Sequence, residues 1–458
     1  MKKIYIIILV VLLSIAIMPI VGNKIAQDKL NESITLLESK GIEIKKSLSD
    51  SGYLKTTKHY KILLKDSKVF LDYLGSTSNP QYSNFSKIYL DGASIGIDLT
   101  YSNFPFASTL KIDIYILSFS EEIMSLLEKN EKEFYTKLNK FLKDKKMFYH
   151  IKYDLSTNKF NGFMKDIDAN FILKDNSSIT YISSDINFEG EGNLLNPNNI
   201  KLNAKEILLR LSGKDGEFEF SLKNFLSTRS LKSKNSFESS VSIDDLSMRL
   251  NSTLRKEISV NMSKIRTELS SSYKNTKLEL SMQNSFDNFS IKSKNLNAEL
   301  SNFNNDLVLK NINKAKYEKL IQILSTVKSN YKTNKAQVED SILEFIASGL
   351  IIDMKDISVK SLILNNEKFD GFSICSRIDI KKDNDFRYKM NNDKEALLKN
   401  IDLNSSIKIS KSIFNQISKD APIVLFTKSY AKEEQENLVY NILFSNTLLE
   451  INGKKIEP

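Results

Sequence analysis

A nearly unbroken alternation of apolar and polar side chains runs from about residue 200 to residue 300 of this chain. A period of two places alternate side chains on opposite faces of a β-strand. Neither glycine nor proline occurs between Gly216 and Gly349, so Asn, Ser, Asp and Lys must form the turns there. The pattern predicts a β-rich α+β fold with a large curved antiparallel sheet and a few long amphipathic helices. The strands predicted in this run are Leu202–Leu211, Phe218–Leu222, Val241–Leu250, Ile258–Leu269, Leu278–Met282 and Phe289–Leu300.

The alternation slips by one residue at two places, Asp244-Asp245 and Ser263-Lys264. A one-residue slip would turn every later side chain to the other face of the sheet. We therefore expect a β-bulge at each place, because a bulge adds one residue to a strand and restores the face.

Four segments show helical spacing of apolar residues. One precedes Gly41, and a second begins after Ser118-Phe-Ser-Glu121, which has the form of a capping box. The third and fourth include the region before Gly349 and the region after Pro422. The predicted helices are Lys24–Lys40, residues 121–142, Ala315–Ala347 and Ile423–Ser445. For each of them, packing against a sheet is the simplest explanation of the apolar stripe.

The run from Phe218 to Leu300 contains no predicted helix that would cover its apolar face. This face must therefore pack on another sheet, on distant helices, on a partner or on lipid chains. A dry core between two sheets and an open lipid groove are both consistent with the pattern. The candidate contact face consists of Val241, Ile243, Met248, Ile258, Val260, Met262, Leu278, Leu280 and Met282.

The amino-terminal segment predicts a membrane anchor. Met1-Lys2-Lys3 precedes an uncharged, predominantly apolar run from Ile4 to Val21, which as a helix would span about 27 Å, close to the hydrocarbon thickness of a bilayer. The alternative is a cleaved signal peptide, but no suitable cleavage site follows the run. We expect residues 1–22 to be a transmembrane anchor, residues 23–310 a helix and an extended β body, and residues 311–458 a helical and β part that closes the same body.

Composition excludes several kinds of chemistry. One cysteine and two histidines exclude a disulfide framework and a conventional Cys/His zinc site, and no phosphate-binding or dinucleotide-binding loop is present. No metal and no cofactor is therefore expected. The net charge of +10 is spread over many lysines, and no arginine precedes Arg210. This diffuse charge argues against nucleic-acid recognition and fits either a Lys-rich soluble surface or proximity to anionic lipid headgroups.

Only one stretch resembles a catalytic motif. Gly92-Ala-Ser94-Ile-Gly96 matches the nucleophile elbow of serine hydrolases, which requires a helix after the serine. An alternating strand follows instead, and the histidine downstream is His150, so a chance match is expected. His59 and His150 are expected to be hydrogen-bonded structural histidines, and Cys375 a buried strand residue.

Four stretches resemble the YdgA-like family of bacterial membrane-anchored proteins, a domain of unknown function. They are the anchor followed by Gly22-Asn-Lys24-Ile, the entry Gly52-Tyr53-Leu-Lys-Thr-Thr to a first strand, Asn103-Phe-Pro105-Phe106, and the closing strand and turn Leu448-Leu-Glu-Ile-Asn452-Gly453-Lys454. The third lacks the His and Gly of the family's stretch, and the second lacks a preceding Arg-Gly. The resemblance implies topology and location, and it carries over no catalytic residue.

These observations together predict a non-enzymatic envelope protein. We expect it to lie in a bacterial inner membrane as a single-pass protein with its bulk in the periplasm. It would act as a scaffold or hold lipid on the apolar β face, with phospholipid or envelope proteins as partners. The alternatives are a homo-oligomeric protein–protein scaffold with a closed core, and a hydrolase that depends on Ser94.

Overall fold

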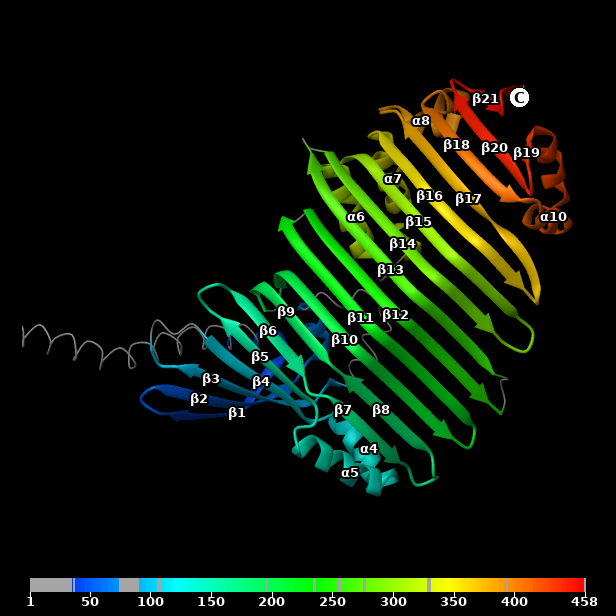
Figure 1. The fold of residues 1–458 in the computed structure, drawn as a ribbon. Helices are drawn as coiled ribbons and strands as arrows, with labels where there is room; N and C mark the ends of the chain where they lie inside the picture. Colours follow the sequence, from blue (N-terminus) through cyan, green and yellow to red (C-terminus); the bar gives the residue numbers. More distant parts are fainter. Residues whose placement is uncertain are drawn as a thin grey trace, which may run out of the picture. The chain divides into compact units, whose positions relative to one another are not determined.

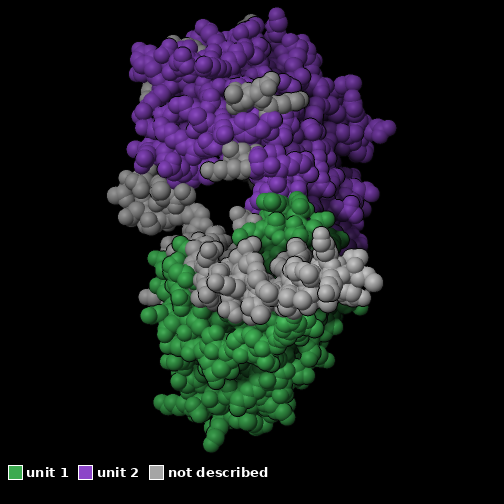
Figure 2. Space-filling model, turned by 90° about the vertical axis from the view of Figure 1, so that its left-hand side faces the viewer, with its two compact units in different colours: residues 1–213 green, residues 214–458 purple. Residues whose placement is uncertain are grey.

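The computed structural model describes Thr35 and residues 38–73, 90–104, 109–194, 196–233, 236–253, 257–274, 277–327, 331–392 and 394–456. The anchor predicted over residues 1–22 lies outside these residues, as does most of the helix predicted over Lys24–Lys40. Among the residues described, no helix has the length and apolar character needed to cross a membrane. The chain divides into two compact units, Met1–Gly213 and Lys214–Pro458 (Figure 2).

From β1 to β6, unit 1 is an antiparallel meander in which each strand pairs with the next along the chain (Figure 1). The next two segments, β6 and β7, follow each other along the chain and pair with different strands. β6 pairs with β9, and β7 pairs with β8. β10 then pairs with both β8 and β9. The strands are β1 (Ile42–Ser51), β2 (Lys55–Leu64), β3 (Ser94–Ser102), β4 (Thr109–Ser118), β5 (Phe148–Asp154), β6 (Lys159–Met164), β7 (Ile167–Ile172), β8 (Ser178–Ser184), β9 (Ile186–Asn193) and β10 (Asn196–Gly213).

The helices of unit 1 differ in two ways from the prediction. The helical segment after β4 is broken at Glu131 into two helices, and the cap is Ser120, whose side chain accepts a hydrogen bond from the Ile123 amide. Ser118 is not a cap, because it is the last residue of β4. The amphipathic second helix buries Phe134, Leu138 and Leu142 against the sheet, which fixes its position. The helices described are α2 (Ser67–Tyr73), α4 (Glu121–Asn130) and α5 (Lys132–Lys143).

Unit 2 is also an antiparallel meander, and its strands are longer than predicted. The strand predicted over Phe289–Leu300 is wrong, because residues 293–296 form a turn. The strands from β11 to β17 are 14 to 18 residues long. They are β11 (Gly216–Ser233), β12 (Ser236–Ser252), β13 (Ile258–Lys274), β14 (Lys277–Lys292), β15 (Asn297–Asn313), β16 (Leu350–Leu364), β17 (Glu367–Ile380), β18 (Ile401–Ser410), β19 (Lys432–Glu434), β20 (Asn437–Ser445), β21 (Leu448–Ile451) and β22 (Lys454–Ile456).

The helices of unit 2 are insertions between strands (Figure 1). The segment predicted as one helix over Ala315–Ala347 forms two helices that pack against each other. The helix predicted over Ile423–Ser445 is wrong, since a 3-10 helix is followed there by β19 and β20. Leu438 and Ile442 are four residues apart, a spacing that fits one face of a helix and one face of a strand equally well. The elements are α6 (Lys314–Val327), α7 (Tyr331–Ala347), α8 (Phe386–Asn392), α9 (Lys394–Leu398), α10 (Lys411–Asp420) and η1 (Pro422–Tyr430).

Candidate functional site

The sheet of unit 2 has a line of interrupted pairing that crosses several strands. Between β12 and β13, Ile243 pairs with Ile265 and Asp245 pairs with Ser263, so one residue on each strand is skipped. Because the same number of residues is skipped on both strands, the pairing register does not shift. The prediction of a β-bulge at Asp244-Asp245 and another at Ser263-Lys264 is therefore wrong. The same interruption recurs between β14 and β15, where Asp287 and Asn302 are skipped.

Left-handed backbone marks this line in every second strand. Asn224 of β11, Lys264 of β13 and Asn302 of β15 have φ angles of 52°, 54° and 50°. Asn tolerates this region better than most residues, but Lys does not, so a local bond network has to hold it. Lys264 Nζ lies 2.8 Å from Asp244 Oδ1, and Asn224 Nδ2 donates to Asp244 Oδ2 over 2.9 Å. These side chains form a polar row across β11, β12 and β13.

The interruption keeps the apolar side chains on one face, which is the result that a bulge would have given. Phe286 and Phe289 are three residues apart and would point to opposite faces of a regular strand. Their ring centroids nevertheless lie 6.2 Å apart, and Phe286 also stacks on Phe303 of β15 at 4.9 Å. Since Phe289 pairs with Met262 and Phe303 with Val359, the apolar face is continuous on both sides of the line.

All nine residues of the predicted contact face lie on this one face of unit 2. Met248 pairs with Val260, and Leu246 with Met262, on one side of the interrupted line. On the other side of the interrupted line, Met282 pairs with Leu269. The nine residues, which we call the apolar lane, are Val241, Ile243, Met248, Ile258, Val260, Met262, Leu278, Leu280 and Met282.

The apolar lane is covered at one end only. Tyr317 of α6 and Phe345 of α7 pack there on a cluster built by Leu278, Ile312 and Leu350. Leu278 is 2% exposed in this cluster. Most other members of the lane are half-buried, and Met248 is 40% exposed. Within the described part of unit 2, a single layer of strands therefore presents apolar side chains that no helix packs on.

The two helices that cover this end are joined by a charge clamp. Lys316 Nζ and Lys319 Nζ of α6 lie 2.8 and 2.9 Å from Glu344 Oε2 of α7. Hydrogen bonds from these two ammonium groups lower the pKa of Glu344 to about 2. The carboxylate thus stays ionised and holds the helical hairpin in place over the cluster.

Unit 1 carries a second arrangement, which the sequence alone did not indicate. Both histidines lie in one row across four strands, with His59 opposite Asp98, Asp98 opposite Asp113, and Asp113 opposite His150. His59 Nδ1 is 2.8 Å from Asp98 Oδ1, and His150 Nδ1 is 2.6 Å from Asp113 Oδ1. Lys145 also pairs with Asp98 at 3.0 Å. Each histidine is thus hydrogen-bonded, as expected for a structural histidine.

The electrostatics of this row stabilise the two adjacent carboxylates. Partial burial acts to raise the pKa of Asp98, but three hydrogen bonds from His59, Lys145 and Tyr115 outweigh it and hold that pKa below its usual range. Two facing carboxylates would otherwise repel each other. In the described part of the chain, no group of three or more His, Cys, Asp or Glu side chains is arranged to hold a metal ion.

Ser94 and Cys375, the other two residues singled out from the sequence, both lie on strands. Ser94 is buried, it begins β3, and its hydroxyl lies 2.6 Å from the hydroxyl of Ser118. Because a strand follows Ser94, the nucleophile elbow is not formed, as predicted. Cys375, predicted to be buried, is exposed on β17, because it alternates with the half-buried Ile374 and the buried Ser376.

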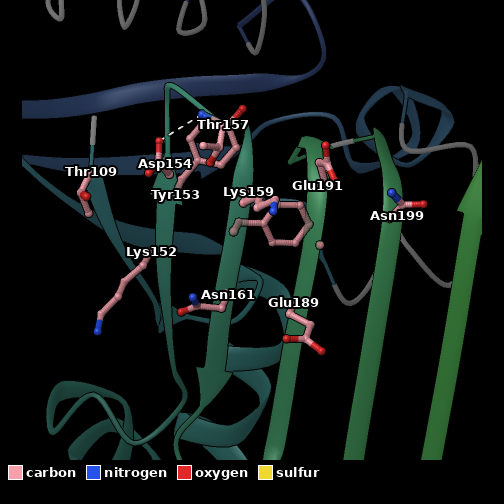
Figure 3. A pocket seen from close by; sticks show the side chains of 12 residues that line it. Thr109, Lys152, Tyr153, Asp154, Thr157, Lys159, Asn161, Glu189, Glu191 and Asn199 are labelled. Carbon is pink, nitrogen blue, oxygen red and sulfur yellow. Dashed lines mark hydrogen bonds between the residues drawn. The ribbon is translucent and has the colours of Figure 1, made fainter. Parts of the chain in front are cut away.

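A hollow of about 560 Å³ lies on the sheet of unit 1, over β4, β5, β6, β9 and β10 (Figure 3). Its labelled side chains carry charges of both signs, and Glu189 is paired with Lys201 at 3.3 Å. Ligand sites for small molecules are mostly apolar with a few polar groups, so this lining does not define a ligand class. The charged residues of the lining are Lys152, Asp154, Lys159, Glu189 and Glu191.

No family model, no curated protein and no solved structure matches this chain. The resemblance to the YdgA-like family thus stays a prediction. The apolar lane is the candidate site that sequence and structure share. The sequence analysis did not predict the row of His59, Asp98, Asp113 and His150. The signal for it was weak, because each of four successive strands contributes a single Asp or His.

Proposed function

We propose that this protein is a non-enzymatic envelope protein that holds lipid acyl chains along the apolar lane. In this proposal residues 1–22 anchor the chain in a bacterial inner membrane, and the β-rich body lies in the periplasm, as the resemblance to the YdgA-like family implies. The observation that carries the proposal is the single-layer sheet of unit 2, whose apolar side chains are continuous across the interrupted line and covered at one end only.

The dimensions of the lane suit an acyl chain. Its nine residues lie on three strands, β12, β13 and β14. Along β13 the lane extends from Ile258 to the row of Tyr273, which pairs with Leu278, and 15 residues at about 3.3 Å each give a row about 50 Å long. One leaflet contributes only half of the roughly 30 Å hydrocarbon core of a bilayer, so a whole acyl chain fits along the row. Exposed apolar surface of this extent is unfavourable in water, and its burial by a lipid chain removes that cost.

The chemistry of the surface favours lipid over a polypeptide. A sheet face offers side chains but no free backbone groups, whereas an added peptide strand is bound through the backbone of an edge strand. Contacts to apolar side chains alone are non-directional and place no demand on the ligand's hydrogen bonding. The polar residues of the interrupted line, such as Asp244 and Lys264, are bonded to each other.

Cross-linking with a photoactivatable phospholipid tests the proposal. The full chain is reconstituted into vesicles that contain the probe, and cross-linked peptides are mapped by mass spectrometry. We expect cross-links in β12, β13 and β14, and a loss of about tenfold with Met262→Lys, because a lysine head group cannot be buried against an acyl chain without a cost of more than 1.4 kcal/mol. Asn261→Lys, on the exposed neighbour of Met262, is the matched control and should leave the yield unchanged.

Cross-links confined to the amino-terminal segment would contradict lipid binding by the lane. In that case a concentration-dependent dimer in light scattering would favour the homo-oligomeric scaffold with a closed core. If both lysine variants lower the yield equally, the loss reflects unfolding or surface charge and not the lane.

A further inference from the structure

The 3-10 helix η1 displays two large apolar side chains to solvent. Leu425 is 53% exposed and Phe426 is 78% exposed. On the last turn of the preceding helix α10, Ile417 is also exposed. Single exposed apolar residues are common, but these three lie on two helices that pack against each other, and we call the three residues the η1 patch.

The geometry of η1 explains why these residues point outward. A 3-10 helix has three residues per turn, so Val424, Thr427 and Tyr430 share one face. This face is turned to the body of unit 2. Val424 packs on the cluster of Phe414, Leu438 and Tyr440, and the carbonyl of Tyr430 accepts a 2.8 Å hydrogen bond from Asn452 Nδ2. The other two faces carry Leu425 and Phe426, which are thereby held away from the core by a fixed element.

Two lysines lie on or beside η1. Lys428 lies on η1 and is exposed, and Lys454 Nζ reaches the carbonyl of Ser429 at 3.4 Å. The two glutamates of the adjacent β19 are each paired with a lysine, at 2.8 Å in both cases. From residue 408 to residue 436 the chain carries five lysines and four acidic residues. The η1 patch therefore joins apolar side chains with the ammonium groups of Lys428 and Lys454.

We propose that η1 is a membrane-contact element, with Leu425 and Phe426 inserted into the interfacial region of an anionic bilayer and Lys428 at its headgroups. Apolar side chains next to lysines on one rigid element are the chemistry that interfacial binding requires. Each lysine near an anionic surface adds a favourable electrostatic contribution, whereas an apolar protein surface would leave these ammonium groups desolvated and unpaired. The contact is independent of the apolar lane, because η1 belongs to a different cluster of unit 2.

A single tryptophan tests this contact, since the chain contains none. Phe426→Trp is made in the full chain, which is reconstituted into vesicles of phosphatidylcholine with phosphatidylglycerol. We expect the emission of the introduced indole to shift to shorter wavelength and to be quenched by lipids with brominated acyl chains. The matched control is Tyr388→Trp on α8, because Tyr388 is 67% exposed in the same unit, and its indole should show neither effect.

Charge and affinity are tested in the same system. In vesicles of phosphatidylcholine alone, and with Lys428→Glu added to Phe426→Trp, we expect quenching to fall severalfold. Leu425→Ser in the Phe426→Trp chain should lower it by about tenfold, through the loss of one buried leucine. Three outcomes would overturn the proposal: equal emission of the two indoles in all vesicles, quenching that is insensitive to lipid charge, or a blue shift that depends on protein concentration in the absence of lipid.

Discussion

Truncation of two side chains in the same apolar lane should have very different costs. Leu278→Ala removes a side chain that is 2% exposed and lies between α6, α7 and the sheet. It leaves a cavity, so we expect a cost of about 2–5 kcal/mol. Met248→Ala removes a side chain that is 40% exposed. Water fills the space, so only part of the 1.5–3 kcal/mol transfer term is lost, about 1 kcal/mol.

Hydrogen exchange read by mass spectrometry measures these costs locally, which suits a chain of two units better than a single unfolding transition. With Leu278→Ala, the opening free energy should fall in the peptides of α6, α7 and the adjoining ends of β14 to β16. With Met248→Ala, the peptides of β12 and β13 should change by about 1 kcal/mol or less. An equal loss of several kcal/mol for Met248→Ala would refute the reasoning, because it would show that the lane is a closed core.

Two further predictions concern other parts of the structure. The pKa of Glu344 is lowered to about 2, so the clamp with Lys316 and Lys319 contributes stability above about pH 4.5 that is lost as the pH falls towards 2. Because these side chains are substantially exposed, Glu344→Gln should cost less than about 1 kcal/mol at neutral pH in thermal melts and should flatten the acid dependence. Gly96→Ala would place a Cβ 2.2 Å from the ring of Tyr115, and the expected overpacking cost is about 1–3 kcal/mol; an unchanged melting temperature would show that the ring can move aside.

The period-two alternation is sufficient to predict a β-rich fold with a large antiparallel sheet and to place the nine residues of the apolar lane on one face of it. Alternation reports which face a side chain takes, and this information is local, so it survives without knowledge of the partner strand. It does not report where a strand ends when no glycine or proline marks the turn. The strand expected over Phe289–Leu300 therefore crossed a real turn at residues 293–296.

Spacings that fit two periods could not be assigned from sequence. Leu438 and Ile442 are four residues apart, and only the pairing of β20 with β18 shows that they belong to a strand. The proximity of the two histidines of unit 1 could not be predicted from sequence either, because His59 and His150 are brought into one row by the order and register of four strands. Such contacts depend on register, which a single sequence does not specify.

The interrupted line of unit 2 explains how a parity slip can be tolerated without a bulge. A bulge in one strand adds an unpaired residue and shifts the register of its neighbours. Between β12 and β13, and between β14 and β15, both strands skip one residue at the same row, so each skipped residue faces another skipped residue and the ladder resumes in register on both sides. The cost is left-handed backbone at Asn224, Lys264 and Asn302, and the bonds of Asp244 offset part of it. The benefit is an apolar face that runs through the line, which is the property that lipid binding along the lane would need.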